Sequence, residues 1–320
     1  MARFIAKRTL ISILIVFLVS IFAFSLMHIL PGDPARLVLG EDATEEALAA
    51  LRAEWNLDKP LVEQYLIWLG DVFHGDFGRS ILYNRPVIDI IGERMPRTVA
   101  IGLPALIISA VVGILCGIIS AVRRGKLADK FITLFSTLGV GTPAFWVGIL
   151  TILLFAINLK ILPIQGFTSP AEDFGDYVKH AILPVFCLSW GMIASIARQT
   201  RSNMLEVINQ DYIRTARANG LASWRIILKH ALRNALIPVI TIAVLQVRVV
   251  IGGSLIVEQV FNIAGIGQLL KAAVSNRDYL IVQTCVLLIS LITVGCNFVV
   301  DILYGVIDPH TRKQRGGNEQ

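Results

Sequence analysis

The sequence predicts an all-α integral membrane protein in which six helices cross the bilayer and a small helical segment lies outside it after the first helix. Hydrophobic residues make up 55% of the 320-residue chain and charged residues only 16%, and the mean hydropathy is +0.69. An ordinary soluble domain is nearer one quarter charged. The length of the uncharged stretches and the placement of basic residues between them support the same fold class.

Six apolar stretches are the predicted transmembrane helices. Residues 9–30, 98–122, 131–159 and 279–300 contain no charged side chain, and each is long enough, at about 20 residues or more, to cross the hydrocarbon core as a helix. Residues 181–197 form a shorter stretch whose flanking Lys and Arg can reach the interface. The sixth stretch, residues 234–257, carries a single charge, Arg248.

The basic residues predict the direction of these helices. With the N-terminus inside, the cytoplasmic segments are 1–8, 123–130, 198–233 and 308–320, which together hold 17 Lys and Arg against five acidic residues. The external segment 31–97 holds seven basic and twelve acidic residues. Because basic loops stay in the cytoplasm, we expect both termini there. The first apolar run is too long for a cleaved signal peptide and lacks a following A-x-A pattern, so we expect it to remain as an anchor.

The predicted spans divide the chain into four parts. Residues 1–30 comprise the cytoplasmic N-terminus and the first helix, and residues 31–97 form the external segment. Residues 98–307 form the transmembrane domain with the other five helices, and residues 308–320 form a cytoplasmic tail.

Turn and cap residues predict the structure of the external segment. Pro31-Gly32-Asp33-Pro34 is a turn cluster that ends the first helix. Thr44, followed by acidic residues, is a cap for a helix over 47–55, and Pro60 precedes a second helix over 61–69. Residues 74–78 have the composition of a loop. The segment is too small for an independent enzyme domain to be expected, so it should pack on the outer face of the bundle.

The third predicted helix contains the run Gly139-Val140-Gly141-Thr142-Pro143. Proline removes a backbone donor and clashes with the preceding turn, which predicts a kink. Such breaks are tolerated where neighbouring helices or a water-filled path satisfy the freed backbone groups. Gly141 and Pro143 are therefore candidates for lining a path through the membrane, with a purely structural kink as the open alternative.

The most informative segment is the cytoplasmic loop 204–238. Asp211 is suited to cap a short helix whose N-terminal end favours an acid, and Gly220 is suited to end it. A short helix between two turns at the inner membrane surface would make a rigid lever for a soluble partner. The residues alone leave a second interpretation open, an interfacial amphipathic helix that binds anionic membrane lipid.

This loop resembles a known family. The run from Asp211 to Gly220, followed by His230-Ala231-Leu232-Arg233-Asn234-Ala235-Leu236-Ile237-Pro238, is similar to the Glu-Ala-Ala (EAA) loop of ATP-binding-cassette importer permeases. More narrowly, the chain resembles the dipeptide/oligopeptide/nickel branch, in the subunit with the larger external segment after helix 1. Further matching stretches run in order along nearly the whole chain: Pro31–Pro34, Leu57-Asp58-Lys59-Pro60, Gln64-Tyr65, Gly75-Asp76-Phe77-Gly78-Arg79-Ser80, Asn276-Arg277-Asp278-Tyr279, Asp301-Ile302-Leu303-Tyr304-Gly305 and Asp308-Pro309.

The resemblance implies a type I importer permease fold and a transport function without chemistry on this chain. A second homologous permease, two cytoplasmic ATPase subunits that bind ATP and Mg, and an external solute-binding protein are the implied partners, in a bacterial cytoplasmic membrane. Di- or oligopeptides are the implied cargo, with a nickel complex or glutathione as alternatives. The residues implied to dock on the ATPase are Asp211, Tyr212, Arg214, Thr215, Ala216, Arg217, Ala218, Gly220, His230, Arg233 and Asn234.

The chain departs from the family pattern in three respects. Arg214-Thr215-Ala216 stands where the general motif has Glu-Ala-Ala, and His230 and Arg233 stand where it has Ile and Pro. Both of these changes resemble the peptide branch. Ala264 stands where that branch commonly has proline, within an external turn.

Charged residues inside the predicted spans are costly and suggest function. Arg248 is a candidate for facing the translocation path or the partner permease, with an ion pair inside the bundle as the alternative. Asp301, near the cytoplasmic end of the last span, is expected to form a structural pair. His28 is expected to be an interface residue with a satisfied side chain.

Other function classes lack their sequence signals. No exposed basic domain is left to bind nucleic acid, and Cys116, Cys187, Cys285 and Cys296 lie in apolar stretches without metal-ligand spacing, so neither a metal nor a cofactor is expected on this chain. No Walker A loop, G-x-S-x-G or H-E-x-x-H motif occurs. Two distant alternatives remain. One is a membrane-embedded enzyme, which would need a paired nucleophile and base at membrane depth. The other is an ion-driven secondary transporter, for which internal repeats and buried acids would be expected.

Overall fold

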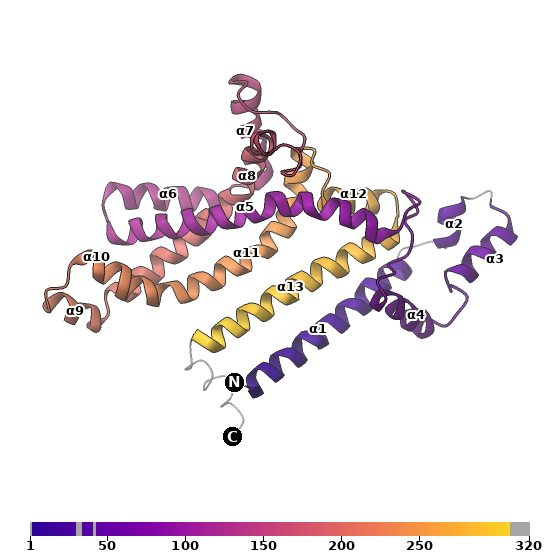
Figure 1. Ribbon diagram of the computed structural model, residues 1–320, viewed down its shortest axis with the longest axis horizontal. Helices are drawn as coiled ribbons and strands as arrows, with labels where there is room; N and C mark the ends of the chain where they lie inside the picture. The colour runs from indigo at the N-terminus through magenta and orange to yellow at the C-terminus, as the bar shows by residue number, and fades with distance from the viewer. Residues whose placement is uncertain (1, 30–33, 41–42, 308–320) are drawn as a thin grey trace.

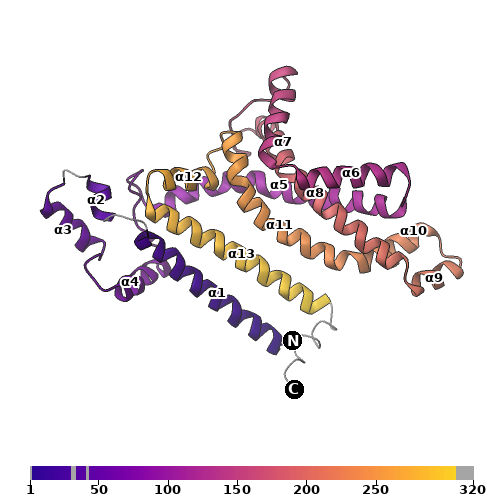
Figure 2. The same ribbon diagram turned by 180° about the vertical axis from the view of Figure 1, so that it is seen from behind.

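The protein is built from helices arranged as an elongated, open bundle (Figures 1 and 2). A computed structural model describes residues 2–29, 34–40 and 43–307, and these contain no β-strand. The predicted turn at Pro31–Pro34, apart from Pro34 itself, and the predicted cytoplasmic tail 308–320 lie outside the described residues. The all-helical class expected from the composition is confirmed.

Thirteen α-helices and two π-helical segments make up the described chain. Their bounds are α1 Ala2–Ile29, α2 Pro34–Leu39, α3 Glu45–Glu54, α4 Leu61–Phe73, α5 Val87–Val122, α6 Leu127–Gly141, α7 Ala144–Thr151, η1 Ile152–Asn158, α8 Phe174–Ile208, α9 Asp211–Ala218, α10 Ser223–Arg225, η2 Ile226–Ala231, α11 Leu232–Val260, α12 Ile266–Ser275 and α13 Tyr279–Ile307.

Five of the described helices are long and apolar enough to cross a membrane, namely α1, α5, α8, α11 and α13. A sixth span results if α6 is counted with the segment from Ala144 to Asn158, which follows it after a bend of 107°. The sequence predicted a kinked helix here, and the structure has a full break. Thr142 and Pro143 both have extended backbone, and Pro143, which lacks a backbone donor, is the residue before α7.

The external segment folds largely as its turn residues predict. Thr44 caps α3, its hydroxyl accepting a hydrogen bond from the Ala47 amide at 3.3 Å, and α4 follows Pro60. Two short helices, α2 and α12, had no sequence prediction. The α5 helix begins at Val87, so it crosses the predicted boundary between the external segment and the membrane domain. Its first turns therefore project beyond the apolar stretch.

The α5 and α8 helices pack closely because glycines on α5 leave room for α8. A Cβ atom on Gly117 would lie 2.4 Å from the Thr200 Cβ and 2.7 Å from the Ala197 carbonyl oxygen, and one on Gly113 would lie 2.8 Å from Ile196. Small residues of this kind let helix backbones approach in a membrane, where association depends on van der Waals contact. The main core lies beside this contact and includes residues of α8 and α11 such as Met192 and Val257.

The first and last helices lie side by side at the edge of the bundle (Figures 1 and 2). Arg8 of α1 and Asp301 of α13 form an ion pair of 2.7 Å, which confirms the structural pair expected for Asp301. At the opposite end of α1, His28 Nε2 lies 3.0 Å from Gln64 Oε1 of α4, which confirms that its side chain is satisfied.

The glycine contact generates the first prediction. Gly117→Ala should lower the thermal unfolding temperature of the detergent-solubilised chain, because the added methyl group overpacks the α5–α8 contact at a cost of about 1–3 kcal/mol. Gly92→Ala is the matched control, since a Cβ on Gly92 of the same helix would meet no atom within 4 Å. Equal unfolding temperatures for the two variants would contradict the close packing.

Candidate functional site

The predicted functional loop connects the ends of two long helices, α8 and α11. The α8 helix ends at Ile208, α9 occupies Asp211–Ala218, and the chain returns through α10 and η2 into α11. These segments lie together at one end of the molecule, away from the external helices α2–α4 (Figure 1). Gly220 has a φ of 76°, the left-handed conformation that glycine adopts without strain, so it ends α9 as its position predicts.

One face of α9 is buried against the helices that the loop connects. Ile213 is fully buried and Ala216 nearly so. They pack in a cluster with Met204 of α8, Ala235 of α11 and Ala121 at the end of α5. Burying an aliphatic side chain of this size contributes roughly 1.5–3 kcal/mol. The short helix is therefore held rigidly on three long helices.

The other face of α9 is exposed and carries most of the residues predicted to dock. The exposed members are Asp211, Tyr212, Arg214, Thr215, Arg217, Ala218 and, just beyond the helix, Gly220. Ala216 is the exception, since it belongs to the buried face. An exposed basic face on a firmly packed short helix is what a docking element needs.

A hydrogen bond joins the two halves of the predicted motif. Asn234 Nδ2 of α11 donates to Tyr212 Oη of α9 at 2.8 Å, although the two residues are far apart in the sequence. His230 is half-buried in η2, and its carbonyl oxygen accepts a second, longer bond from Asn234 Nδ2. Arg233 lies in α11, and its side chain lies outside the described part of the chain.

The predicted cap of α9 is wrong by one residue. Gln210 occupies the cap position with extended backbone and makes no side-chain capping bond. Asp211 is already helical, and its Oδ1 accepts a 3.3 Å contact from Arg214 Nη1. Its charge still lies in the first turn, where the helix dipole favours an acid.

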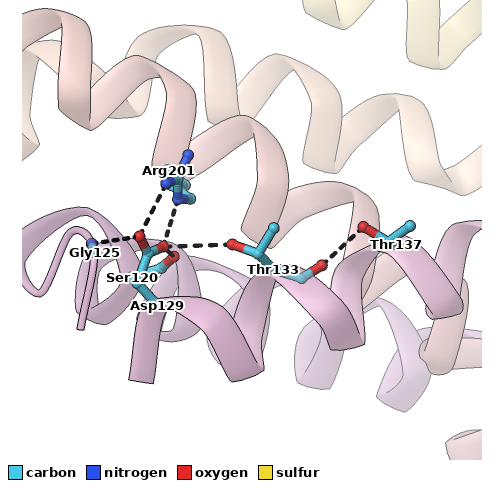
Figure 3. Close-up of polar contacts among 6 residues, drawn as sticks. All are labelled: Ser120, Gly125, Asp129, Thr133, Thr137 and Arg201. Atoms are coloured by element: carbon cyan, nitrogen blue, oxygen red, sulfur yellow. Dashed lines mark hydrogen bonds and ion pairs between the residues drawn. The ribbon is translucent and has the colours of Figure 1, made fainter. Parts of the chain in front are cut away.

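Close to this loop, a buried ion pair joins α6 to α8 (Figure 3). Asp129 is 5% exposed and binds Arg201 through two bonds, Nε to Oδ1 at 2.7 Å and Nη2 to Oδ2 at 3.0 Å. The Ser120 hydroxyl donates to Oδ1 at 2.5 Å and the Gly125 amide to Oδ2 at 2.9 Å. The carboxylate therefore ties the end of α5, the following turn and the start of α6 to α8.

This ion pair supports the docking loop because both share the end of α5. Ser120 donates to Asp129, and the next residue, Ala121, packs in the α9 cluster. Arg201 lies one turn before Met204, which also belongs to that cluster. A buried pair is costly to break, because removing one partner leaves the other charge uncompensated.

The three residues predicted to line a membrane path are all exposed. Arg248 is exposed on α11, at about 21 Å along the helix from Asn234 at 1.5 Å per residue. Gly141 and Pro143 are exposed at the break between α6 and α7. Arg248 makes no hydrogen bond or ion pair with the described residues. The alternative, an ion pair inside this chain's own bundle, is therefore not observed among them.

Two buried carboxylates fasten the opposite end of the molecule. Glu258 of α11 accepts hydrogen bonds from Thr98 Oγ1 at 2.6 Å and from the Gln268 amide at 3.0 Å, which joins α5, α11 and α12. Asp278 accepts from Ser80 Oγ at 2.5 Å and the Leu82 amide at 3.0 Å. In the external turn, the Ala264 carbonyl accepts contacts from Arg94 and Arg97 at 3.3 Å.

Sequence reasoning predicted the docking loop and missed the groups that hold it. In the sequence, Asp129 and Arg201 contribute only to the counts of acidic and basic residues in the predicted cytoplasmic segments. Their separation in sequence, with no shared motif, offered no signal that they pair. Within the described residues, no group of three His, Cys, Asp or Glu side chains is placed to hold a metal ion.

Two family models match the chain. The model described as "Binding-protein-dependent transport system inner membrane component" covers residues 113–313. The model described as "Binding-prot-dependent transport system membrane comp, N-term" covers residues 1–102. The fold and the matches together define a multi-pass permease of the inner membrane. The chain belongs to the family of inner membrane components of binding-protein-dependent transport systems.

Curated relatives match over nearly their full length. A probable peptide ABC transporter permease protein of Sinorhizobium fredii is 39% identical over 312 residues, which covers 98% of this chain and 100% of the relative. An oligopeptide transport system permease protein of Bacillus subtilis is 39% identical over 97% of this chain and 99% of its own length. A glutathione transport system permease protein of Escherichia coli is 39% identical over 98% of this chain and 99% of its own length.

The buried ion pair generates the second prediction. Asp129→Asn should destabilise the solubilised protein by roughly 3 kcal/mol, near the lower end of the cost of breaking a buried pair, because Arg201 keeps partial contact with solvent. Thermal or denaturant unfolding measures this difference. Glu63→Gln is the control, since it removes one partner of the exposed Lys59–Glu63 pair and exposed pairs contribute little. An Asp129→Asn variant as stable as the control would refute the role assigned to the pair.

Proposed function

We propose that this chain is one of two transmembrane permease subunits of an ATP-binding-cassette importer that carries a di- or oligopeptide across the cytoplasmic membrane. The single observation that carries this proposal is α9, a short helix packed on the ends of α5, α8 and α11 that exposes a basic face. The peptide and oligopeptide relatives favour peptides as the cargo.

In this proposal the exposed face of α9 docks in a cleft of a cytoplasmic ATPase subunit. ATP and Mg bind the two ATPase subunits, and this chain supplies no catalytic group. When the ATPases close, α9 moves with them. Because α9 is packed on Met204 and Ala235 and bonded to Asn234, its movement is transmitted directly to α8 and α11. The Asp129–Arg201 pair makes α6 follow α8.

A second homologous permease is the proposed partner within the membrane. Arg248 is exposed in the middle of a span, and a charge facing lipid at that depth costs several kcal/mol. A partner subunit or a water-filled path between the two subunits would remove that cost. The break at Gly141 and Pro143 is the other element that we assign to the path, because its freed backbone groups need water or protein partners.

The remaining assignments concern orientation and cargo. We place both termini in the cytoplasm, following the basic loops, and the external helices toward a solute-binding protein. Glutathione is the second candidate cargo, because one relative of equal identity is named for it. A nickel complex has no specific support in the described residues.

The third prediction tests the docking loop. Arg217→Glu should reduce ATP-driven dipeptide uptake into proteoliposomes of the assembled transporter by about tenfold or more, the effect of about 1.4 kcal/mol, because it reverses an exposed docking charge. Lys126→Glu reverses an exposed charge in the α5–α6 turn, at the same end but outside the docking loop, and should leave uptake unchanged.

Two outcomes would contradict the proposed function. One is uptake by the purified chain alone, without any ATPase subunit. The other is ATP-driven uptake by Arg217→Glu at the wild-type rate while Lys126→Glu is impaired, which would place the docking surface elsewhere.

The fourth prediction concerns Arg248. Arg248→Gln should change the transport rate or the preference among dipeptides of different charge, because the charge faces the path or the partner permease. Arg248→Lys should retain much of the wild-type behaviour, and Arg124→Gln, an exposed charge in the α5–α6 turn, should retain all of it. Unchanged rate and preference in Arg248→Gln would remove this residue from the path.

A further inference from the structure

The structure contains a cavity outside the proposed path, at the external end of the molecule. It has a volume of about 420 Å³ and lies between the end of α1, the α3–α4 region, the loop that follows α4, and the start of α13. These elements meet at the same end in both views (Figures 1 and 2). Arg248, Gly141 and Pro143 do not line it, so it is separate from the residues assigned to transport.

A buried glutamine with an unpaired amide nitrogen lies in the wall of this cavity. Gln283 of α13 lines it and is 2% exposed, and its Nε2 donates to no acceptor among the described residues. A buried donor left unpaired costs about 1–3 kcal/mol. Most buried polar groups are bonded, and Gln283 Nε2 is one of five buried side-chain atoms without a partner among the described residues. Because this nitrogen is itself buried, the Gln283 side chain has to turn toward the cavity to donate to an acceptor that a ligand would bring.

A second glutamine in the cavity wall provides a contrast. Gln64 of α4 donates through Nε2 to the Lys59 carbonyl at 2.8 Å and, more weakly, to the Leu57 carbonyl. Its Oε1 lies 3.0 Å from His28 Nε2. Gln64 is therefore engaged in holding α4 to α1 and to the preceding turn, whereas the Gln283 amide nitrogen has no such structural task.

The exposed rim of the cavity is acidic. Asp71 and Asp76 both line it and are both exposed, and within the described chain no ion pair is recorded for either. Arg79 also lines the cavity, but its Nε and Nη2 both donate to the Asn84 carbonyl, at 3.1 and 2.9 Å. Two carboxylates against one guanidinium leave the lining with a net negative charge, which attracts a cation.

Aromatic rings form much of the wall between the rim and the buried amide. Phe24, Trp55, Trp68 and Phe77 line the cavity. The Phe24 and Trp68 rings are fixed by mutual contact, with centroids 5.8 Å apart. Ring faces attract ammonium groups, so the wall and the rim favour the same kind of ligand.

We propose that this cavity binds a small molecule that carries a primary ammonium group close to a hydrogen-bond acceptor. The ammonium group would lie among the aromatic rings near Asp71 and Asp76, and the acceptor would receive the Gln283 amide. The amino terminus of a peptide or amino acid has this chemistry, and so does an ethanolamine headgroup. The site binds a ligand beside the path and does not depend on which cargo the transporter carries.

The test measures binding to the full chain in nanodiscs of phosphatidylcholine, whose trimethylated headgroup has no N–H donor. Calorimetry with alanyl-phenylalanine as the probe should detect a complex, and the N-acetylated dipeptide should not bind. Gln283→Leu and Asp71→Asn should each weaken binding about tenfold or more. Asp58→Asn is the matched control, since Asp58 is an exposed acid of the same segment that does not line the cavity, and it should bind as the wild type does.

A second arm distinguishes the two sources of the ammonium group. If the headgroup is the occupant, native mass spectrometry of discs that contain phosphatidylethanolamine should detect this lipid bound to the wild type and not to Gln283→Leu. Dipeptide binding that is equal in both kinds of disc assigns the site to a soluble amino compound. Because Asp71 is exposed, Asp71→Asn should fold and still test the proposal if Gln283→Leu does not fold.

Three results would overturn the proposal. They are the absence of both dipeptide and ethanolamine-lipid binding, equal binding by the wild type and Asp71→Asn, and undiminished binding of the N-acetylated dipeptide. None of these measurements uses ATP or transport. A chain that binds the dipeptide here yet carries none across the membrane would contradict the proposed function and leave this site standing.

Discussion

The close contact between α5 and α8 sets the positions of the turn after α5 and of α6. In a bilayer, lipid tails are as apolar as the side chains they would replace, so burial alone does not hold helices together. Gly113 and Gly117 allow close approach instead. Once α5 and α8 are fixed side by side, the turn after α5 brings Asp129 within reach of Arg201, and α6 completes a three-helix layer.

That layer gives the docking loop a rigid base. The α9 helix has only eight residues, and isolated helices shorter than about 12–15 residues are marginal in water. Its stability comes from Ile213 and Ala216, which pack on the ends of three long helices. The same packing that forms α9 also links it to the spans, so a force on α9 is carried into the membrane. The packing that stabilises α9 is thus also the contact through which its proposed movement would reach the spans.

The two ends of the molecule are stabilised differently. At the end with α9, one bidentate pair and an apolar cluster hold the helices. At the external end, Glu258 and Asp278 are buried carboxylates that accept bonds from hydroxyls and backbone amides. The external cavity has the Gln283 amide nitrogen in its wall, one of five buried side-chain atoms without a hydrogen-bond partner among the described residues.

The helical class, the approximate spans and the helices of the external segment were predictable from the sequence, and the docking loop is its prediction for the functional site. These depend on local properties: the length of apolar runs, the caps at Thr44 and Pro60, the left-handed Gly220 and the motif from Asp211 to Pro238. Only the tertiary structure decided that the third span breaks by 107°, that Asp129 meets Arg201 and that Gln283 is left without a partner. Each of these depends on contacts between residues far apart in sequence, which no local pattern records.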